Sequence, residues 1–327
     1  MSKPVRAIAS LIAFAIVAAA PSAGQAGDFP TRPIKVVVAF PPGGGADLTA
    51  RTVAQKLGES MHQPVVVENR AGANGAVGAA SVAKATPDGY TLLFIDRGAL
   101  GINPSLYAKL AYDPVKDFAH VCIATEAPYV LVVNPALGVG TVAELATLAR
   151  RRPGELLYGS FGIGSMAQLN LESLNRRLGI ELRHVPYKGA GPAVQAVVAG
   201  EVGVALASAP SVLGFLREGR LRAIAVGSAR RLSLLPDVPT MAEAGLGADV
   251  LLPTWFAFSA PAGTPDEIVA RLNAEMRRAL AAPEVVEQLS RNGLVPYGST
   301  PQAMASTVRE DVARFAAITK AIGLKPE

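Results

Sequence analysis

The chain has 327 residues, half of them hydrophobic and 17% charged, so it can form one large or two medium domains with a sizeable core. Its formal net charge of +5 is mild and its basic residues are scattered, which argues against nucleic acid as a partner. The single cysteine, Cys122, excludes an internal disulfide.

The first 26 residues have the layout of a secretory signal peptide. Lys3 and Arg6 form a positive n-region, residues 7–20 form an apolar segment, and Gly-Gln-Ala at 24–26 is a small-residue cleavage site. A membrane anchor is the alternative, but the segment is short and lacks a flanking stop signal. We therefore expect an exported protein whose mature chain begins near Gly27.

Short apolar runs alternate with helical patterns along the mature chain. We expect strands over residues 34–40, 64–68, 90–95, 156–159, 181–185, 203–206 and 221–226, and helices over residues 47–57, 76–84, 166–178, 192–199 and 210–217. The pairs Thr141 with Glu144 and Thr240 with Glu243 fit the capping box that begins a helix. This alternation predicts βαβ units and mainly parallel sheets with helices on both faces.

Two extended stretches, residues 129–134 and 251–258, interrupt the alternation and link one α/β block to the next. The segment from Pro265 onward is mostly helical and has no complete α/β unit, so it should pack back on the first block. The sequence therefore predicts an α/β protein of two lobes, with the second lobe inserted in the first, two hinge strands and a ligand cleft between the lobes. Lobe 1 comprises residues 27–130 and 253–327, and lobe 2 comprises residues 131–252.

A glycine-rich loop joins the first strand to the first helix of the mature chain. Pro41 and Pro42 end the strand because proline cannot donate a ladder hydrogen bond. The glycines at 43–45 permit positive φ and leave backbone N–H groups uncovered, and Asp47 can cap the helix. Bare amides at a helix N-terminus form a cradle for an anion. The alternative is a tight turn that binds nothing, and a nucleotide P-loop is excluded because no Lys-Ser or Lys-Thr follows.

The second block carries a similar loop between a strand and the helix at 166–178. Its residues are Ser160, Gly162, Gly164 and Ser165. The glycine spacing fits a dinucleotide fingerprint, but the acid required at the end of the next strand is missing, since Glu181 falls at that strand's beginning. If both loops face one cleft, a dianionic or long carboxylated ligand can bridge them.

The sequence offers little support for an enzyme. No nucleophile elbow of the Gly-x-Ser-x-Gly kind is present. The histidines His62, His120 and His184 lie far apart, and none has a second ligand at metal spacing. We predict no catalytic residue, no metal and no cofactor, and an exported hydrolase is the weaker alternative.

Six segments occur in order along the mature chain: FPPGGGADLTAR, QPVVVENRAGANG, TPDGYTLLF, INPSLYAKLAYDPVKDF, HVPYKGAGPAVQAVVAGEV and LPDVPTMAEAG. Together they resemble the periplasmic substrate-binding proteins of tripartite tricarboxylate transporters, also called the Bug family. The resemblance implies a periplasmic, type II binding-protein fold without prosthetic group, a small organic carboxylate as ligand, and membrane permease subunits as partners. We expect a monomer. A binding protein that signals to a membrane sensor is the alternative function.

The resemblance also assigns ligand-binding residues. The first loop contributes Phe40, Pro41, Pro42, Gly43, Gly44, Gly45 and Asp47, and the second contributes Ser160, Gly162, Gly164 and Ser165. The turn after Ile95 contributes Arg97, either as a carboxylate fork or as a solvated loop arginine. The end of the strand at 203–206 contributes Ala207 and Ser208.

The residues at 207 and 208 bear on the ligand's chemistry. Many members of the family carry Asp-Asn at this place, whereas this chain has Ala207 and Ser208. A ligand ammonium group would lose its water there without gaining a counter-charge. We therefore expect a carboxylate without an amine, unless Asp96 or Asp47 supplies the missing charge.

Overall fold

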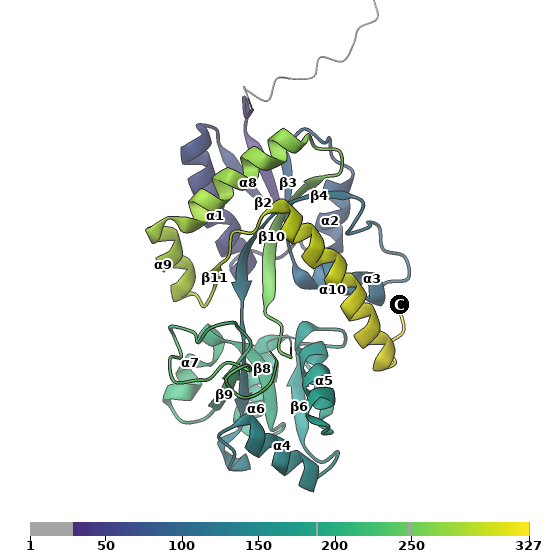
Figure 1. The fold of residues 1–327 in the computed structure, drawn as a ribbon, viewed down its shortest axis with the longest axis vertical. Helices are drawn as coiled ribbons and strands as arrows, with labels where there is room; N and C mark the ends of the chain where they lie inside the picture. Colours follow the sequence, from purple (N-terminus) through teal and green to yellow (C-terminus); the bar gives the residue numbers. More distant parts are fainter. Residues whose placement is uncertain (1–28, 188, 248–249, 327) are drawn as a thin grey trace, which may run out of the picture.

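The computed structural model describes residues 29–187, 189–247 and 250–326, and it consists of two lobes stacked along the long axis (Figure 1). The signal-peptide prediction lies outside the described residues. Each lobe contains one sheet with helices on both faces. The expected two-lobe α/β fold is therefore confirmed. Within the described ranges, no helix is both long and apolar enough to cross a membrane.

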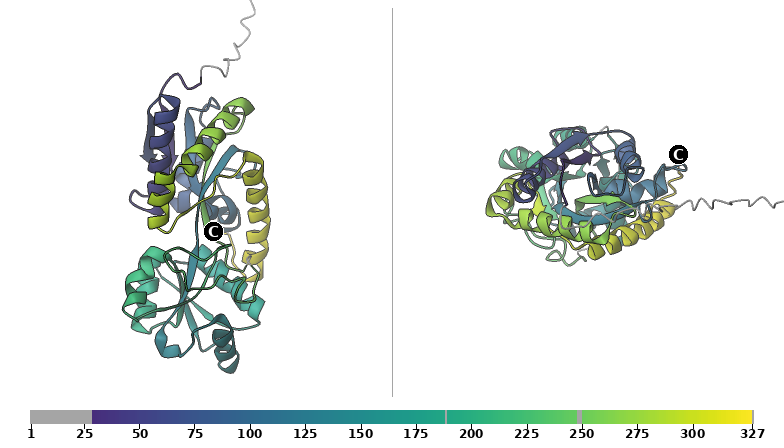
Figure 2. Two further views of the ribbon diagram at one scale, coloured as in Figure 1. Left: turned by 60° about the vertical axis from the view of Figure 1, so that its left-hand side comes forward. Right: turned by 90° about the horizontal axis from the view of Figure 1, so that it is seen from above.

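Lobe 1 is built on a six-stranded sheet in the order β11-β4-β10-β3-β1-β2. Its strands are β1 (Ile34–Val38), β2 (Val65–Asn69), β3 (Thr91–Asp96), β4 (Phe118–Ala127), β10 (Thr254–Pro261) and β11 (Val295–Pro296). Helices α1 (Gly45–Met61), α8 (Asp266–Ala281) and α9 (Pro283–Arg291) pack on one face. Helices α2 (Ala76–Ala83) and α10 (Pro301–Ala321) pack on the other, and Figure 2 shows these layers on either side of the sheet.

Lobe 2 is built on a five-stranded sheet in the order β7-β6-β8-β5-β9. Its strands are β5 (Tyr129–Val133), β6 (Leu157–Ser160), β7 (Arg183–Pro186), β8 (Val204–Ser208) and β9 (Arg222–Val226). Helices α4 (Val142–Arg151) and α5 (Met166–Leu178) pack on one face. Helices α6 (Ala190–Ala199) and α7 (Ala209–Arg217) pack on the other.

The chain passes between the lobes at two places. It leaves lobe 1 at the end of β4 and enters β5 after the single residue Pro128, and it returns into β10 at Thr254. The lobe boundary expected at 130/131 therefore falls inside β5. Helix α10 also bridges the lobes, because Phe315 belongs to the core that α4 and α5 form in lobe 2.

The prediction of mainly parallel sheets is wrong. In the described chain, four strand pairs are parallel and five are antiparallel. The antiparallel pairs all involve β4, β5 or β10, the strands that carry the chain between the lobes. The sequence analysis also did not predict strands β4 and β11. Strand β4 is buried along most of its length, so it lacks the polar alternation of a strand with one exposed face.

The helix start predicted at Thr141 is confirmed, and the one predicted at Thr240 is not. Thr141 Oγ1 accepts the amide of Glu144 at 3.1 Å, and the Glu144 side chain accepts the amide of Gly140, at the start of α4. Thr240 and Glu243 form a fully reciprocal pair, in which the Glu243 side chain accepts the Thr240 amide and Thr240 Oγ1 accepts the Glu243 amide, yet only a turn follows. Gly245, with φ of +81°, ends that turn before a helix can continue.

Candidate functional site

A cavity of about 350 Å³ lies between the two lobes. Lobe 1 lines it with the glycines at 43–45 and with Leu48, Ala127, Thr254, Phe256, Asn292, Gly293 and Leu294, and lobe 2 lines it with Tyr129, Phe161, Ala190, Ser208 and Pro210. Four of the sequence-predicted site residues, Gly43, Gly44, Gly45 and Ser208, therefore meet at one cavity. The structure brings the first glycine loop and the end of β8 together across the cleft.

The first loop presents the N-terminus of α1 to this cavity. Gly44 is the N-cap residue, in an extended conformation with φ of −86°, and the first intrahelical bond runs from the Leu48 amide to the Gly44 carbonyl. The amides of the first turn precede that bond and so have no intrahelical partner. Only Gly43 has the positive φ, +87°, that was expected of the glycines in this loop.

Asp47 shapes the first loop rather than capping α1. Its Oδ2 accepts the Gly43 amide at 3.0 Å, and its carboxylate also binds Arg51 Nε and Asn69 Nδ2. Burial alone would raise the pKa of Asp47, but these bonds outweigh it and lower the pKa to about 2. The carboxylate is therefore ionised and engaged by its neighbours.

The other residues predicted for the first loop lie beside the cavity rather than on its wall. Phe40 is half-buried, and its carbonyl accepts a hydrogen bond from Asn69 at 3.0 Å. Pro41 and Pro42 are exposed to solvent. They lie in the connection between the end of β1 at Val38 and the start of α1 at Gly45.

In the second loop, the predicted residues hold the backbone while Phe161 faces the cavity. Ser160 is fully buried, and its Oγ accepts the Gly162 amide at 3.2 Å. Ser165 caps α5 by accepting the amide of Gln168. A Cβ on Gly164 would lie 2.6 Å from the Leu106 side chain of α3 (Asn103–Leu106), so this glycine allows lobe 2 to contact lobe 1.

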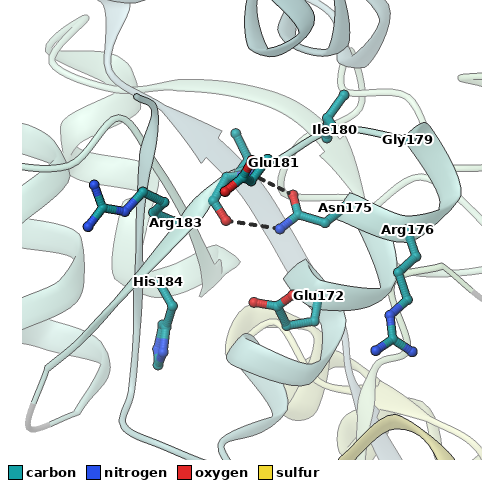
Figure 3. Close-up of a pocket in the computed structure, with 9 residues that line it drawn as sticks. Glu172, Asn175, Arg176, Gly179, Ile180, Glu181, Arg183 and His184 are labelled. Atoms are coloured by element: carbon teal, nitrogen blue, oxygen red, sulfur yellow. Dashed lines mark hydrogen bonds between the residues drawn. The ribbon is translucent and has the colours of Figure 1, made fainter. Parts of the chain in front are cut away.

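Ser160 is also joined to a hollow on lobe 2. Its Oγ lies 2.6 Å from Nε2 of His184, and His184 lines a hollow of about 530 Å³ between α5 and β7 (Figure 3). Burial lowers the pKa of His184, and the nearby Glu172 offsets this only in part. None of the sequence-predicted ligand residues lines this hollow. His184 therefore supports the second loop through Ser160 and does not line the interlobe cavity.

Arg97 lies in neither of the environments considered from the sequence. It is buried, its Nε donates to Asp311 Oδ2 at 2.7 Å, and its Nη1 donates to the Pro253 carbonyl. The guanidinium also lies over the ring of Trp255. These contacts tie the end of β3 to α10 and to the start of β10, so Arg97 is engaged within the protein.

Ala207 does not line the cavity either. Its methyl group is fully buried in lobe 2, in the core that contains Val130 and Val212. The next residue, Ser208, is the N-cap of α7 and lies on the cavity wall. The side chain that faces the cleft at this point is therefore a neutral hydroxyl.

The cavity combines helix N-termini with uncharged walls. Gly45, Ala190 and Ser208 place the N-termini of α1, α6 and α7 at its edge. None of the described residues that line it has a charged side chain. A helix N-terminus carries about half a positive charge, so the site favours an anion bound through backbone amides.

Sequence reasoning missed Tyr129, Thr254, Phe256 and Leu294 as cavity residues. Tyr129 and Thr254 are the first residues of β5 and β10, the strands that carry the chain between the lobes. The expected crossing stretches, 129–134 and 251–258, were the available signal. A crossing strand has to pass the cleft, so its first residues are candidates for the wall.

Asp96 is the acid that the sequence left open as an amine partner. It pairs with Phe256 across β3 and β10, so the two side chains project from the same face of the sheet. Its Oδ1 accepts the Ala99 amide at 2.8 Å. Burial raises the pKa of Asp96 to about 6, although the amides of Ala99 and Gly98 oppose the rise.

Replacing Asp96 by asparagine is expected to stabilise the protein near pH 7.5 but not near pH 4. The pKa of Asp96 in the folded protein lies above the ordinary value of 3.8. Its stabilising contribution is therefore complete below 3.8 and is lost as the pH rises through 6. Asparagine keeps the acceptor without the charge, and the gain near pH 7.5 should approach about 3 kcal/mol. Urea unfolding of both proteins at the two pH values measures it, and an equal difference at both would contradict the expectation.

Comparison with known proteins shows that the chain is similar to transport receptors. The model of the tripartite tricarboxylate transporter family receptor, TctC, matches residues 49–324. Protein BugT of Bordetella pertussis is 38% identical over 326 residues, which is 99% of each chain.

Two solved structures are similar in both fold and sequence. The structure "R. palustris Rpa4515 with adipate" is 36% identical with a TM-score of 0.76, covering 92% of this chain and 100% of that one. MatC from Rhodopseudomonas palustris with bound malate is 35% identical with a TM-score of 0.70, covering 89% and 99%. The ligand of each of these two proteins, adipate for Rpa4515 and malate for MatC, is a carboxylate.

Proposed function

The chain belongs to the family of tripartite tricarboxylate transporter receptors, and from this premise we propose that it captures a small organic carboxylate between its two lobes. One observation carries the proposal: the interlobe cavity joins three helix N-termini with walls that have no charged side chain among the described lining residues. Such a site neutralises an anion with backbone dipoles. The ligands named for Rpa4515 and MatC, adipate and malate, support the same chemical class.

The contacts available in the cleft are sufficient for useful affinity. A helix N-terminus contributes about 0.3–1 kcal/mol when exposed and up to about 2 kcal/mol when partly buried. Each hydrogen bond to a charged group adds about 1.5–3 kcal/mol. A carboxylate held by the first turn of α1, with a second contact to α6 or α7, is then consistent with a dissociation constant on the order of micromolar.

The proposed ligand has no amine, although Ala207 is not the reason. Its methyl lies in the core of lobe 2, so the residue there does not decide what the cleft binds. The support comes from the uncharged cavity wall and from Asp47, whose carboxylate is engaged by Arg51. Asp96 and Glu126 are further acids in this part of lobe 1, and neither of them lines the cavity. An ammonium ion would enter without a firm counter-charge.

The proposed place of action is the periplasm, after removal of the first 26 residues. The partners are the membrane permease subunits of a tripartite transporter, to which the closed, loaded protein would deliver the ligand as a monomer. Signalling to a membrane sensor remains the second candidate, because the same closed form can be presented to either partner. Permease genes beside this gene would favour delivery, and a sensor-kinase gene would favour signalling.

A thermal-shift screen of the mature protein is expected to show stabilisation by small mono- and dicarboxylates and none by neutral sugars. At a hundredfold excess over the dissociation constant, binding adds about 2.7 kcal/mol, a rise of several degrees in melting temperature. Calorimetry with matched pairs, succinate against aspartate and adipate against 2-aminoadipate, tests the absence of an amine. Binding of a sugar with no response to any acid would overturn the carboxylate class. An amino acid that binds tenfold tighter than its amine-free partner, a difference of about 1.4 kcal/mol, would overturn only the prediction that the ligand has no amine.

A further inference from the structure

Six exposed arginines lie together at the end of lobe 2 that points away from lobe 1. Strand β6 runs from Leu157 toward the cleft, so the turn before it and the ends of α4 and α5 lie at the opposite end, where Figure 1 shows α4. Arg150 joins these segments, because its Nη2 donates to the Leu178 carbonyl at 2.6 Å. The Gly154 amide donates to the Glu181 carbonyl at 3.2 Å, which brings the chain before β7 alongside. We call this surface the basic tip, and its arginines are Arg150, Arg151, Arg152, Arg176, Arg177 and Arg183.

The basic tip carries more positive charge than its surroundings neutralise. None of the six arginines forms an ion pair with a described residue. The acids on the same segments are Glu155, Glu172 and Glu181, so the arginines outnumber them two to one. A helix C-terminus carries about half a negative charge, so the ends of α4 and α5 together offset only about one positive charge. Arg176 and Arg183 extend away from each other on either side of the hollow in Figure 3, so the tip presents its charge to solvent.

The side chains that the basic tip lacks indicate the kind of partner. Among the described residues, the exposed large hydrophobic side chains all lie outside it: Val66, Val77, Val115, Ile163, Val286, Val295 and Tyr297. Specific protein interfaces are centred on apolar or aromatic anchors, and sites for single-stranded nucleic acid use exposed aromatic rings. The head groups of anionic lipids need neither, because they attract exposed basic side chains by charge alone. The composition of the tip therefore favours an anionic lipid surface.

We propose that the basic tip binds the surface of bilayers that contain anionic phospholipids. The guanidinium groups donate to lipid phosphates, for which their planar fork is suited. Binding is reversible and weakens with salt, because the charges on both sides are exposed. Since the tip lies at the end of lobe 2 opposite the cleft, the protein can rest on a bilayer while the interlobe cavity stays open to its ligand. The proposal is independent of what the cleft binds.

Sedimentation of the mature protein with lipid vesicles tests the basic tip. The vesicles consist of phosphatidylcholine alone or of phosphatidylcholine mixed with phosphatidylglycerol, which supplies the anionic surface. At low salt we expect the protein to bind the anionic vesicles at least about tenfold more strongly than the neutral ones. Salt on the order of 0.5 M should remove the difference, because it screens the exposed charges. The triple variant Arg151→Gln, Arg152→Gln and Arg177→Gln should lose most of the preference.

A second triple variant is the matched control. Arg271→Gln, Arg277→Gln and Arg314→Gln remove the same charge from exposed positions on α8 and α10 of lobe 1, and this protein should keep the preference of the wild type. Melting curves of both triple variants should resemble that of the wild type, because all six side chains are exposed.

Three results would overturn the proposal. The first is equal binding of the wild type to neutral and anionic vesicles at low salt, which needs no variant. The second is an equal loss of preference in both triple variants, which would make net charge rather than the basic tip responsible. The third is tighter binding to a DNA duplex than to anionic vesicles at the same salt, which would make the tip a surface for nucleic acid. Carboxylate binding in the cleft is measured separately and stands or falls without these results.

Discussion

Valine in place of Gly44 is expected to abolish carboxylate binding and to leave the fold intact. The backbone of Gly44 has φ of −86° and ψ of 176°, a conformation open to any residue, and a Cβ there would meet no atom within 4 Å. The added side chain would stand in the interlobe cavity, over the first turn of α1. Loss of two hydrogen bonds to a charged group weakens binding by roughly a hundredfold or more, which calorimetric titration beside a melting curve measures.

Two neighbouring substitutions separate binding from stability. Gly43→Val places a branched residue at φ of +87°, so it should lower the melting temperature as well as affinity. Gly138→Val imposes similar strain at φ of +69°, in the turn before α4 in lobe 2 and away from the cavity. It should lower the melting temperature and leave affinity unchanged. A Gly44→Val protein that binds as tightly as the wild type would show that the anion does not bind at the first turn of α1.

The first loop shows how far the sequence determined the site. Proline pairs end strands and glycines expose amides for local reasons, so the strand, the loop and the helix N-terminus were predictable. Which glycine takes the positive φ depends on where the helix begins. The helix begins at Gly45, with Gly44 as its cap, because Asp47 reaches back to the Gly43 amide and is held by Arg51 and Asn69. Asn69 arrives from β2, a contact that no local pattern contains.

The alternation of strands and helices predicted the layers of both lobes for similar reasons. It could not predict strand direction, because β5 and β10 pair according to where the chain crosses the cleft. For the same reason, the sequence analysis did not identify Tyr129 and Thr254 as residues that line the interlobe cavity. Their positions follow from the pairing of β10 with β4 and of β5 with β8, and these are long-range contacts.

Arg97 is the clearest case of a contact that the sequence could not predict, because its partner Asp311 lies 214 positions away in the sequence. Methionine in place of Arg97 is expected to destabilise lobe 1 strongly. The guanidinium and the Asp311 carboxylate are both nearly buried, with side-chain exposures of 10% and 5%. Removing one member of a buried ion pair leaves the other charge uncompensated and costs about 3–5 kcal/mol. The melting temperature should fall by on the order of 10 °C.

A second substitution, at Asp311, tests whether the unpaired buried charge causes the loss of stability. Asp311 also accepts the indole N–H of Trp255 at 3.1 Å, and asparagine can retain that acceptor. The double variant with Arg97→Met and Asp311→Asn should therefore recover part of the loss, since no buried charge is left unpaired. Arg291→Met, which breaks an exposed pair with Glu287 on α9, should change stability little. If Arg97→Met were as mild as Arg291→Met but reduced carboxylate affinity, Arg97 would belong to the binding cleft after all, and the buried pair would not be what fixes the end of β3 against α10.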